Sequence, residues 1–270
     1  MNTNIYQQFA RYYNVEQYAQ FSAFMLEQFP ALVQRFGLPK GGSLLEIACG
    51  NGAFAVGMAQ QGWQVCGIDQ SAAQLELARQ RAEDAAVGAD FRQMDMRELP
   101  FEAAFDLATC WFDSINYLLS EADWQQAFAA VYRALKPGGY YLFDMNTIYG
   151  IMVRWQSYGV SSVVVSTPTL LEIHRNSADH ERTLAHLHIT IFERSSTMTG
   201  GEYLWQRMDE IHTEHALPLK RVRALLTECG FAVRDVLGGL QEFVPPRADS
   251  SRAWFICQKP DPSSPNQEQA

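Results

Sequence analysis

Strands alternate with helices along residues 44–146, and this alternation constrains the fold more than any other feature of the chain. Apolar runs of strand length begin at residues 44, 63, 89, 105 and 140. Between them lie an Ala-rich helical segment at 71–86 and a second helical segment at 120–135. Such alternation predicts a parallel sheet with helices on both faces. We therefore expect an α/β fold.

The alternation stops at residues 148–212. The segments there are rich in β-branched and aromatic residues and are separated by turn signals such as "NSAD" and "TGG". This pattern predicts an antiparallel meander. Afterwards "LPLKRVRALLTECG" predicts a helix, and "FAVRDVLGG" and "RAWFICQK" predict two strands. These two strands are so close in sequence that we expect an antiparallel hairpin.

Composition limits the possible partners. The chain has 270 residues, a hydrophobic fraction of 47% and a net charge of −9, so it can form a core, and an acidic surface disfavours nucleic acid. Its five cysteines are scattered, without the close pairs of a zinc site, which predicts no metal and a reducing cytoplasm. The first residues lack the features of a signal peptide, and no stretch has the length of a membrane span. We expect a cytoplasmic protein without a membrane partner.

The stretch "LLEIACGNG", residues 44–52, ends a strand in small residues that let the backbone approach a ligand closely. A nicotinamide dinucleotide would fit such a loop, with Asp69 at the end of the second strand holding a ribose. Three features favour another cofactor. Glu46 lies inside the first strand, where it could hold an amino group; Asp95 ends the third strand, where it could bind an adenine amine; and the chain ends in the hairpin.

In this order and spacing, "LLEIACGNGAF", "GID", "MDM" and "LKPGGYYLFD" resemble the motifs of class I S-adenosylmethionine-dependent methyltransferases, over residues 40–147 and 216–258. Ala48 departs from the family, which most often has glycine there. The inserted meander resembles the lid of the small-molecule subgroup that includes glycine N-methyltransferase and amino-sugar N-methyltransferases. The resemblance implies a Rossmann-like, mainly parallel seven-stranded sheet with helices on both faces and an inserted antiparallel β lid.

The resemblance also implies which residues bind S-adenosylmethionine and its product S-adenosylhomocysteine. Glu46 would organise the amino-acid end, Asp69 the ribose hydroxyls, and Asp95 with the Met96 amide the adenine. The remaining candidates are Tyr13, Ala48, Cys49, Gly50, Gly52, Gln70, Cys110, Trp111 and Phe112. Structural alternatives stay open: Asp69 as a strand-end carboxylate, Asp95 as a helix N-cap, and the aromatic candidates as core residues.

The methyl acceptor is expected near the polar residues that follow the fourth and fifth strands. These are Asp113, Asn116, Tyr117 and Asn146. In the meander, period-two alternation places Glu210 and His212 on one face, and we predict either of them to be the proton acceptor. Alternatively, this face is solvated. For His186 and His188, which share a face of another strand, we favour the solvated interpretation.

The expected organisation is an N-terminal helical cap at 1–36, a cofactor-binding domain at 37–147 and 213–258, a substrate lid at 148–212 and a disordered tail at 259–270. The predicted function is transfer of a methyl group to nitrogen or oxygen of a small molecule. RNA or protein methylation, and cofactor binding without catalysis, are the alternatives. The sequence is also compatible with a homodimer.

Overall fold

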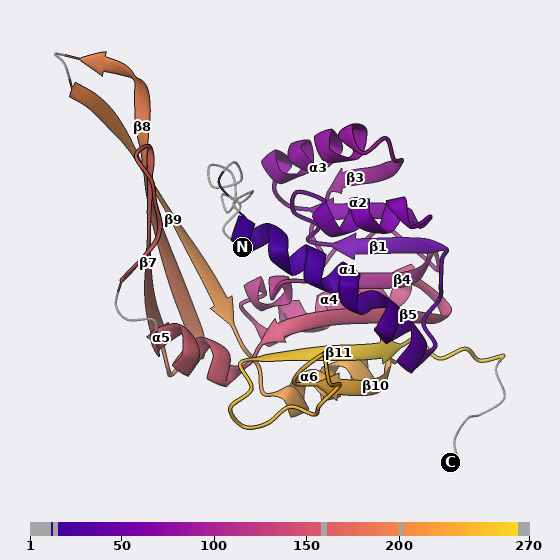
Figure 1. Cartoon of the computed structure of the whole chain (residues 1–270). Helices are drawn as coiled ribbons and strands as arrows, with labels where there is room; N and C mark the ends of the chain where they lie inside the picture. Colours follow the sequence, from indigo (N-terminus) through magenta and orange to yellow (C-terminus); the bar gives the residue numbers. More distant parts are fainter. Residues whose placement is uncertain (1–11, 13–15, 158–160, 200–201, 264–270) are drawn as a thin grey trace.

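A seven-stranded sheet forms the centre of the molecule (Figure 1). The computed structural model describes residues 12, 16–157, 161–199 and 202–263. The strands lie in the order β10-β11-β5-β4-β1-β2-β3. Their bounds are β1 (Ser43–Ile47), β2 (Gln64–Asp69), β3 (Ala89–Gln93), β4 (Phe105–Cys110), β5 (Leu135–Asn146), β10 (Ala232–Leu237) and β11 (Arg252–Gln258). Strands β1 to β5 pair in parallel, whereas β11 is antiparallel to both β5 and β10. The predicted mainly parallel sheet and its final hairpin are confirmed.

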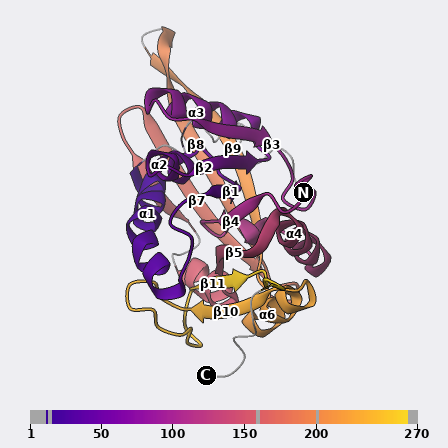
Figure 2. The same cartoon turned by 90° about the vertical axis from the view of Figure 1, so that its right-hand side faces the viewer.

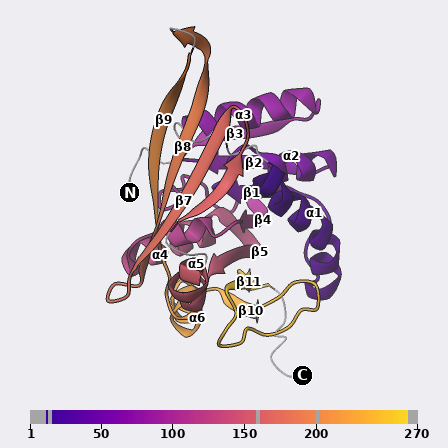
Figure 3. The ribbon, with the colours of Figure 1, turned by 60° about the vertical axis from the view of Figure 1, so that its left-hand side comes forward.

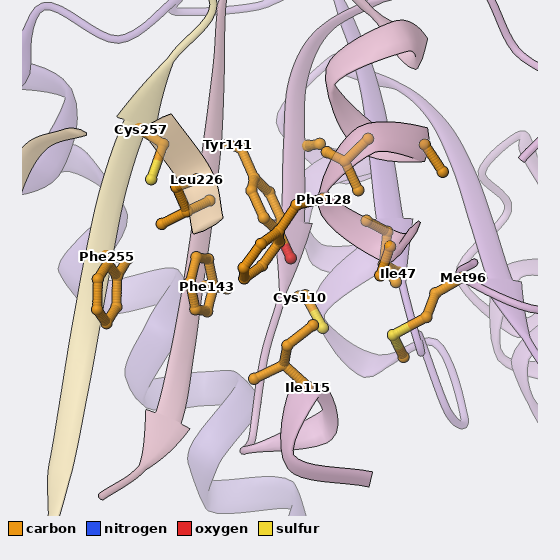
Figure 4. Packing of buried hydrophobic residues seen from close by; sticks show 14 of the residues in the cluster. Ile47, Met96, Cys110, Ile115, Phe128, Tyr141, Phe143, Leu226, Phe255 and Cys257 are labelled. Atoms are coloured by element: carbon orange, nitrogen blue, oxygen red, sulfur yellow. The ribbon is translucent and has the colours of Figure 1, made fainter. Parts of the chain in front are cut away.

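Helices cover both faces of this sheet (Figure 2). Helices α1 (Glu16–Phe36), α2 (Ala53–Gln60) and α3 (Ala72–Asp84) contribute to one hydrophobic core, and α4 (Glu121–Ala134) and α6 (Leu219–Glu228) to the other. Successive strand residues point to opposite faces, so in β4 Leu107 joins the first core and Ala108 the second. Figure 4 shows the second core, in which the rings of Phe143 and Phe255 stack at 4.9 Å.

A second, antiparallel sheet is inserted between β5 and α6. Its strands β6 (Ser162–Ser166), β7 (Leu170–Asp179), β8 (Leu184–Thr199) and β9 (Glu202–His215) pair in sequence order. A π-helical turn (Gly150–Arg154) and the short helix α5 (Trp155–Ser157) precede it. This sheet, the lid, stands beside the carboxyl ends of the parallel strands (Figures 1 and 3). The predicted antiparallel lid is confirmed.

Two further expectations concern the ends of the chain and membranes. Lys259, the first residue of the tail expected to be disordered, is attached to the sheet, since its backbone N–H donates to the Gly139 carbonyl at 2.8 Å. Residues 264–270 lie outside the described part. Within that part, no helix is both long and apolar enough to cross a bilayer.

Candidate active site

The loop between β1 and α2 passes through left-handed backbone conformations, with φ of 54° at Ala48, 52° at Gly50 and 71° at Gly52. A Cβ at Gly52 would lie 2.8 Å from the Cβ of Ala78, so only glycine fits there. At Gly50 a Cβ would meet nothing closer than Gln74 Oε1 at 4.0 Å. The loop is therefore packed at Gly52 and open at Gly50, where a ligand can approach the backbone.

Glu46 is an acidic residue inside the buried strand β1. Its side chain is 3% exposed, and Oε2 has no hydrogen-bond partner in the described structure. Burial raises the pKa of Glu46 well above its usual range; an N–H from Ala55 lowers it in part, and the nearby Asp69 raises it further. A buried carboxyl oxygen without a partner is costly. A cationic amino group beside the loop would satisfy it, so Glu46 fits the amino-acid end of S-adenosylmethionine.

Asp69 ends β2 and ties two segments together. Its Oδ2 accepts the backbone N–H of Gly50 at 2.9 Å, and its Oδ1 accepts that of Ser71 at 2.8 Å. Burial raises the pKa of Asp69, and these two donors lower it in part. The neighbouring Gln70 is half-buried, and its carbonyl accepts from Gln93 Nε2 at 2.9 Å. Asp69 is thus held beside the open side of the glycine loop, where it could accept hydrogen bonds from a ribose.

Asp95 follows β3 and forms an ion pair. Arg97 lies 2.6 Å from its Oδ2, and the backbone N–H of Arg97 donates to its Oδ1 at 2.9 Å. Residues 96–97 form a turn and no helix follows, so Asp95 is not a helix N-cap. The Met96 side chain is buried. The carboxylate keeps acceptor capacity for an adenine amine.

The three residues at the end of β4 differ in position. The Cys110 side chain is fully buried in the second core (Figure 4), and Trp111 is 6% exposed with its ring 5.8 Å from that of Phe54. The pleat directs these two side chains into opposite cores, and their place in the cofactor site stays a prediction. Phe112 is half-buried against Phe21 of α1 at 4.8 Å. Of the three aromatic or sulfur side chains, only that of Phe112 lies at the strand edge.

The turn after β4 is held by an acid that is not among the predicted site residues. Phe112 and Asp113 have φ of 57° and 50°, which is rare for such residues. Asp144 of β5 accepts their backbone N–H groups at 2.6 and 3.0 Å. Asp144 is an acid within a buried apolar strand. Because the same pattern singled out Glu46, Asp144 could also have been predicted from the sequence.

Arg252 of β11 joins this turn to a buried polar network. It contacts Asp144, and it lies 3.2 Å from Oδ1 of Asp113. Asn146 Nδ2 donates to Asp113 and, at 2.9 Å, to Glu214 Oε2 of the lid. Burial raises the pKa of Asp144 to about 6, although Arg252 lowers it, and burial raises that of Glu214 well above its usual range. The network connects the main sheet to the lid.

The raised pKa of Asp144 predicts a pH dependence of stability. The folded state holds this proton up to about pH 6, whereas the unfolded chain releases it near pH 4. The stabilisation is therefore complete below pH 4 and is lost as the pH rises to 6, by on the order of 3 kcal/mol. We expect Asp144→Asn to make the slope shallower in urea unfolding measured from pH 4 to 7, while the raised pKa values of Glu46, Asp69 and Glu214 keep the rest of it. Asp90→Asn, at an exposed carboxylate, should keep the slope; equal slopes in Asp144→Asn and wild type would contradict the assignment.

Asn116, predicted to bind the acceptor, joins the two sheets instead. Its side chain is fully buried, and its Nδ2 donates to the carbonyls of Asn146 and His215 at 3.0 and 2.9 Å. Its Oδ1 accepts the backbone N–H of Asn146 at 2.9 Å. Both amide hydrogens are used, so this side chain supports the site without donating to a ligand.

Tyr117 connects the lid to the edge of the main sheet at which the parallel strands end. Its hydroxyl lies 2.7 Å from Nδ1 of His212, and Nε2 of His212 lies 3.0 Å from Glu210 Oε1. Leu187 and Ile189, the cross-strand partners of His212 and Glu210, share their face of the lid. His212 is 2% exposed. We call this buried side of β7, β8 and β9 the inner face.

The opposite side of the lid is the outer face, which carries His186 and His188. His188 is 28% exposed and contacts Asp209 at 3.2 Å and Arg175 at 2.7 Å. His186 contacts Thr213 at 2.9 Å. The preferred solvated interpretation of His186 and His188 agrees with their place on the outer face.

Tyr13, the last predicted cofactor residue, lies outside the described residues. The adjacent Tyr12 is 6% exposed and packs against Ile189 and Ile191 of the inner face. Its hydroxyl donates to Glu193 Oε2 at 2.7 Å. Part of the N-terminal segment therefore lies against the lid. Within the described residues, no three His, Cys, Asp or Glu side chains are arranged to hold a metal ion.

Comparison with known proteins decides the family. A model described as "Methyltransferase domain" matches residues 44–139. A putative methyltransferase of Geobacillus sp. (strain WCH70) is 30% identical over 238 residues, which cover 84% of this chain and 88% of that protein. The chain belongs to the methyltransferase family. As a methyltransferase it is an enzyme, as the sequence motifs predicted.

Two further proteins resemble this methyltransferase over most of its length. A dTDP-3-amino-3,6-dideoxy-α-D-glucopyranose N,N-dimethyltransferase of Streptomyces fradiae is 26% identical over 214 residues, 77% of each chain. The crystal structure of an S-adenosylmethionine-dependent methyltransferase from Clostridium acetobutylicum ATCC 824 has a TM-score of 0.78 at 21% identity and covers 95% of this chain and 100% of that one. The methyltransferase therefore shares its whole fold, lid included, with that enzyme.

Proposed function

We propose that this methyltransferase transfers the methyl group of S-adenosylmethionine to a small-molecule acceptor held between the carboxyl ends of the parallel strands and the lid. The observation that carries the proposal is the 2.7 Å contact between Tyr117, which follows β4, and His212 of the inner face. It joins a polar part of the lid directly to the sheet edge at which α/β folds bind ligands.

The cofactor residues support this choice. S-adenosylmethionine supplies a methyl group on a positively charged sulfur, which an acceptor lone pair attacks in line. Glu46 holds the amino group at its unpartnered oxygen, the open side of Gly50 gives access to the backbone, and Asp69 accepts from the ribose hydroxyls. The half-buried Phe112 closes the site next to the turn held by Asp144.

The chain's own contribution to the transfer is alignment and proton acceptance. Buried surroundings fix donor and acceptor and exclude water. Glu210 and His212 lie 3.0 Å apart, and either can take the proton that an ammonium or hydroxyl acceptor must lose. Tyr117 fixes the other ring nitrogen of His212, which orients the imidazole.

A turnover screen tests the proposal against its rivals. We expect release of S-adenosylhomocysteine when the enzyme and cofactor meet at least one member of a panel of small amines, hydroxyl compounds and carboxylates. Turnover with RNA or protein only would favour the macromolecular alternative. Cofactor binding without any turnover would favour a sensor.

Removing charge and basicity from the lid should reduce turnover and leave cofactor binding intact. In the double variant Glu210→Gln, His212→Asn we expect turnover to fall at least about tenfold, roughly 1.4 kcal/mol of transition-state stabilisation. Affinity for S-adenosylhomocysteine should change less than about threefold, since the proposed cofactor contacts lie on the main sheet. Steady-state kinetics and calorimetry measure the two effects.

The matched control is His188→Asn on the outer face, which should retain wild-type turnover. If the double variant also retains it, Glu210 and His212 take no part in the transfer. The acceptor contacts would then be sought around Asp113 and Tyr117.

A further inference from the structure

The tripeptide Glu-Ile-His occurs twice in the lid, at 172–174 in β7 and at 210–212 in β9. In a strand, residues two apart share a face, so each tripeptide presents its acid and its imidazole together. Glu172 pairs across β8 with Ile191, the partner of Met208, and His174 pairs with Ile189, the partner of Glu210. Both tripeptides therefore belong to the inner face.

The first tripeptide, like the second, brings its acid close to its imidazole. Glu172 Oε1 lies 2.6 Å from Nε2 of His174, compared with 3.0 Å between Glu210 and His212. The two pairs flank β8, so their strands are two strand spacings, roughly 10 Å, apart. Ile189 and Ile191, each 2% exposed, lie on β8 between them. The two Glu–His pairs are thus separated on the inner face by apolar side chains of β8.

Glu172 has an unused hydrogen-bonding atom. Its side chain is 0% exposed, and Oε2 has no partner within the described residues, whereas Oε1 is engaged by His174. A buried acid with a purely structural role is normally satisfied at both oxygens. A ligand-binding carboxylate needs one oxygen that the protein holds in place and one that can accept from the ligand. Glu172 meets both conditions.

Apart from histidine, the ionisable side chains at the inner positions are all acidic. The alternation and register of the three lid strands determine which residues point to the inner face. Within 170–178, 185–193 and 206–214, these residues include four glutamates and no lysine or arginine. The four are Glu172, Glu193, Glu210 and Glu214. Carboxylates in a water-poor site attract a cation and repel carboxylates and phenolates.

We propose that Glu172 and His174 form an acceptor-binding subsite for an amine, in which the Glu172 carboxylate accepts a hydrogen bond from an amino or ammonium group. This inference rests on the proposed function and narrows its acceptor to an amine. His174 acts as a positioning residue that holds Oε1 and directs Oε2 to the ligand. The subsite contributes to acceptor binding, and the proton acceptor of the transfer remains on β9.

Matched pairs of probes that differ by one amine test the subsite. The first pair is 3-amino-3-deoxyglucose and glucose; the second is dTDP-3-amino-3,6-dideoxyglucose and dTDP-6-deoxyglucose. Binding is measured by calorimetry with saturating S-adenosylhomocysteine. We expect wild type to bind the amine of at least one pair about tenfold or more tightly than its hydroxyl partner, and Glu172→Gln to reduce this preference below about threefold.

Asp209→Asn is the control, because Asp209 also contacts a histidine but on the outer face; it should keep the wild-type preference. His174→Gln leaves the Glu172 charge in place and should lower the preference as well, so the subsite stays testable if Glu172→Gln folds poorly. Wild type that binds no amine, or prefers none, overturns the inference, as does an unchanged preference in both inner-face variants. If S-adenosylhomocysteine itself does not bind, the proposed function fails, and this inference fails with it.

Discussion

Replacement of Arg252 by methionine is expected to lower the free energy of unfolding by about 3–5 kcal/mol. Arg252 contacts Asp144 and Asp113, which are 0% and 7% exposed. Methionine fills much of the same volume but carries no charge, so the two carboxylates would remain buried without their cation. The proximity of these acids, together with burial, then opposes their ionisation. Urea unfolding at pH 7 measures the loss.

Arg221→Met is the matched control. Arg221 also contacts two carboxylates, those of Glu121 and Glu228, both at 2.7 Å, but on the surface. Solvent screens such pairs, so this variant should lose far less stability. Similar losses in the two variants would mean that Arg252 is not the central cation of a buried network.

Replacement of Asp69 by alanine is expected to weaken binding of S-adenosylhomocysteine by about 2 kcal/mol, roughly 30-fold. The variant loses a charged acceptor for the ribose hydroxyls, and it also releases the N–H groups of Gly50 and Ser71 that Asp69 now holds. Calorimetry on the folded variant gives the affinity.

Asp90→Ala is the control for this effect, since Asp90 lies on the adjacent strand β3 and pairs with Arg92 on the surface. It should bind the ligand as wild type does. An Asp69→Ala variant with wild-type affinity would remove Asp69 from the cofactor site and leave it only the role of tying the glycine loop to α3.

The sequence predicted the main sheet because its information is local. Each strand and helix of residues 44–146 has its own periodicity, and short connections leave few ways to assemble them. The same reasoning found the glycine loop, Glu46 and Asp69, which lie close together in the sequence. It also found the final hairpin, whose strands are near neighbours.

Contacts between distant segments could not be predicted in this way. Arg252 and Asp144 are 108 residues apart, and they meet only because β11 inserts antiparallel beside β5. Asn116 looked like a ligand-binding residue because it follows a strand, yet its two amide hydrogens go to the carbonyls of Asn146 in β5 and His215 in β9. Cys110 and Trp111 were expected at the site for the same reason, and the pleat directs their side chains into the cores.

The structure of the lid could be predicted only in part from the sequence. Period-two alternation correctly grouped Glu210 with His212, and His186 with His188. It could not say that the two groups lie on opposite faces or which face is buried, since that depends on the register of the strands and on how the sheet stands against the strand ends. The repeated Glu-Ile-His tripeptide was visible in the sequence. Its meaning depends on the register of β7, β8 and β9, which brings both copies to the inner face.

The most direct test of the account is a pair of calorimetric titrations of the wild-type protein, one with S-adenosylhomocysteine and one with NAD. Both ligands suit a glycine-rich loop followed by an acid at the end of the second strand, whereas the buried, unpartnered oxygen of Glu46 suits only the ligand with an amino-acid end. We predict that S-adenosylhomocysteine binds to one site per chain and that NAD produces no binding heat. Binding of NAD alone would contradict the account and would make the sheet edge a dinucleotide site.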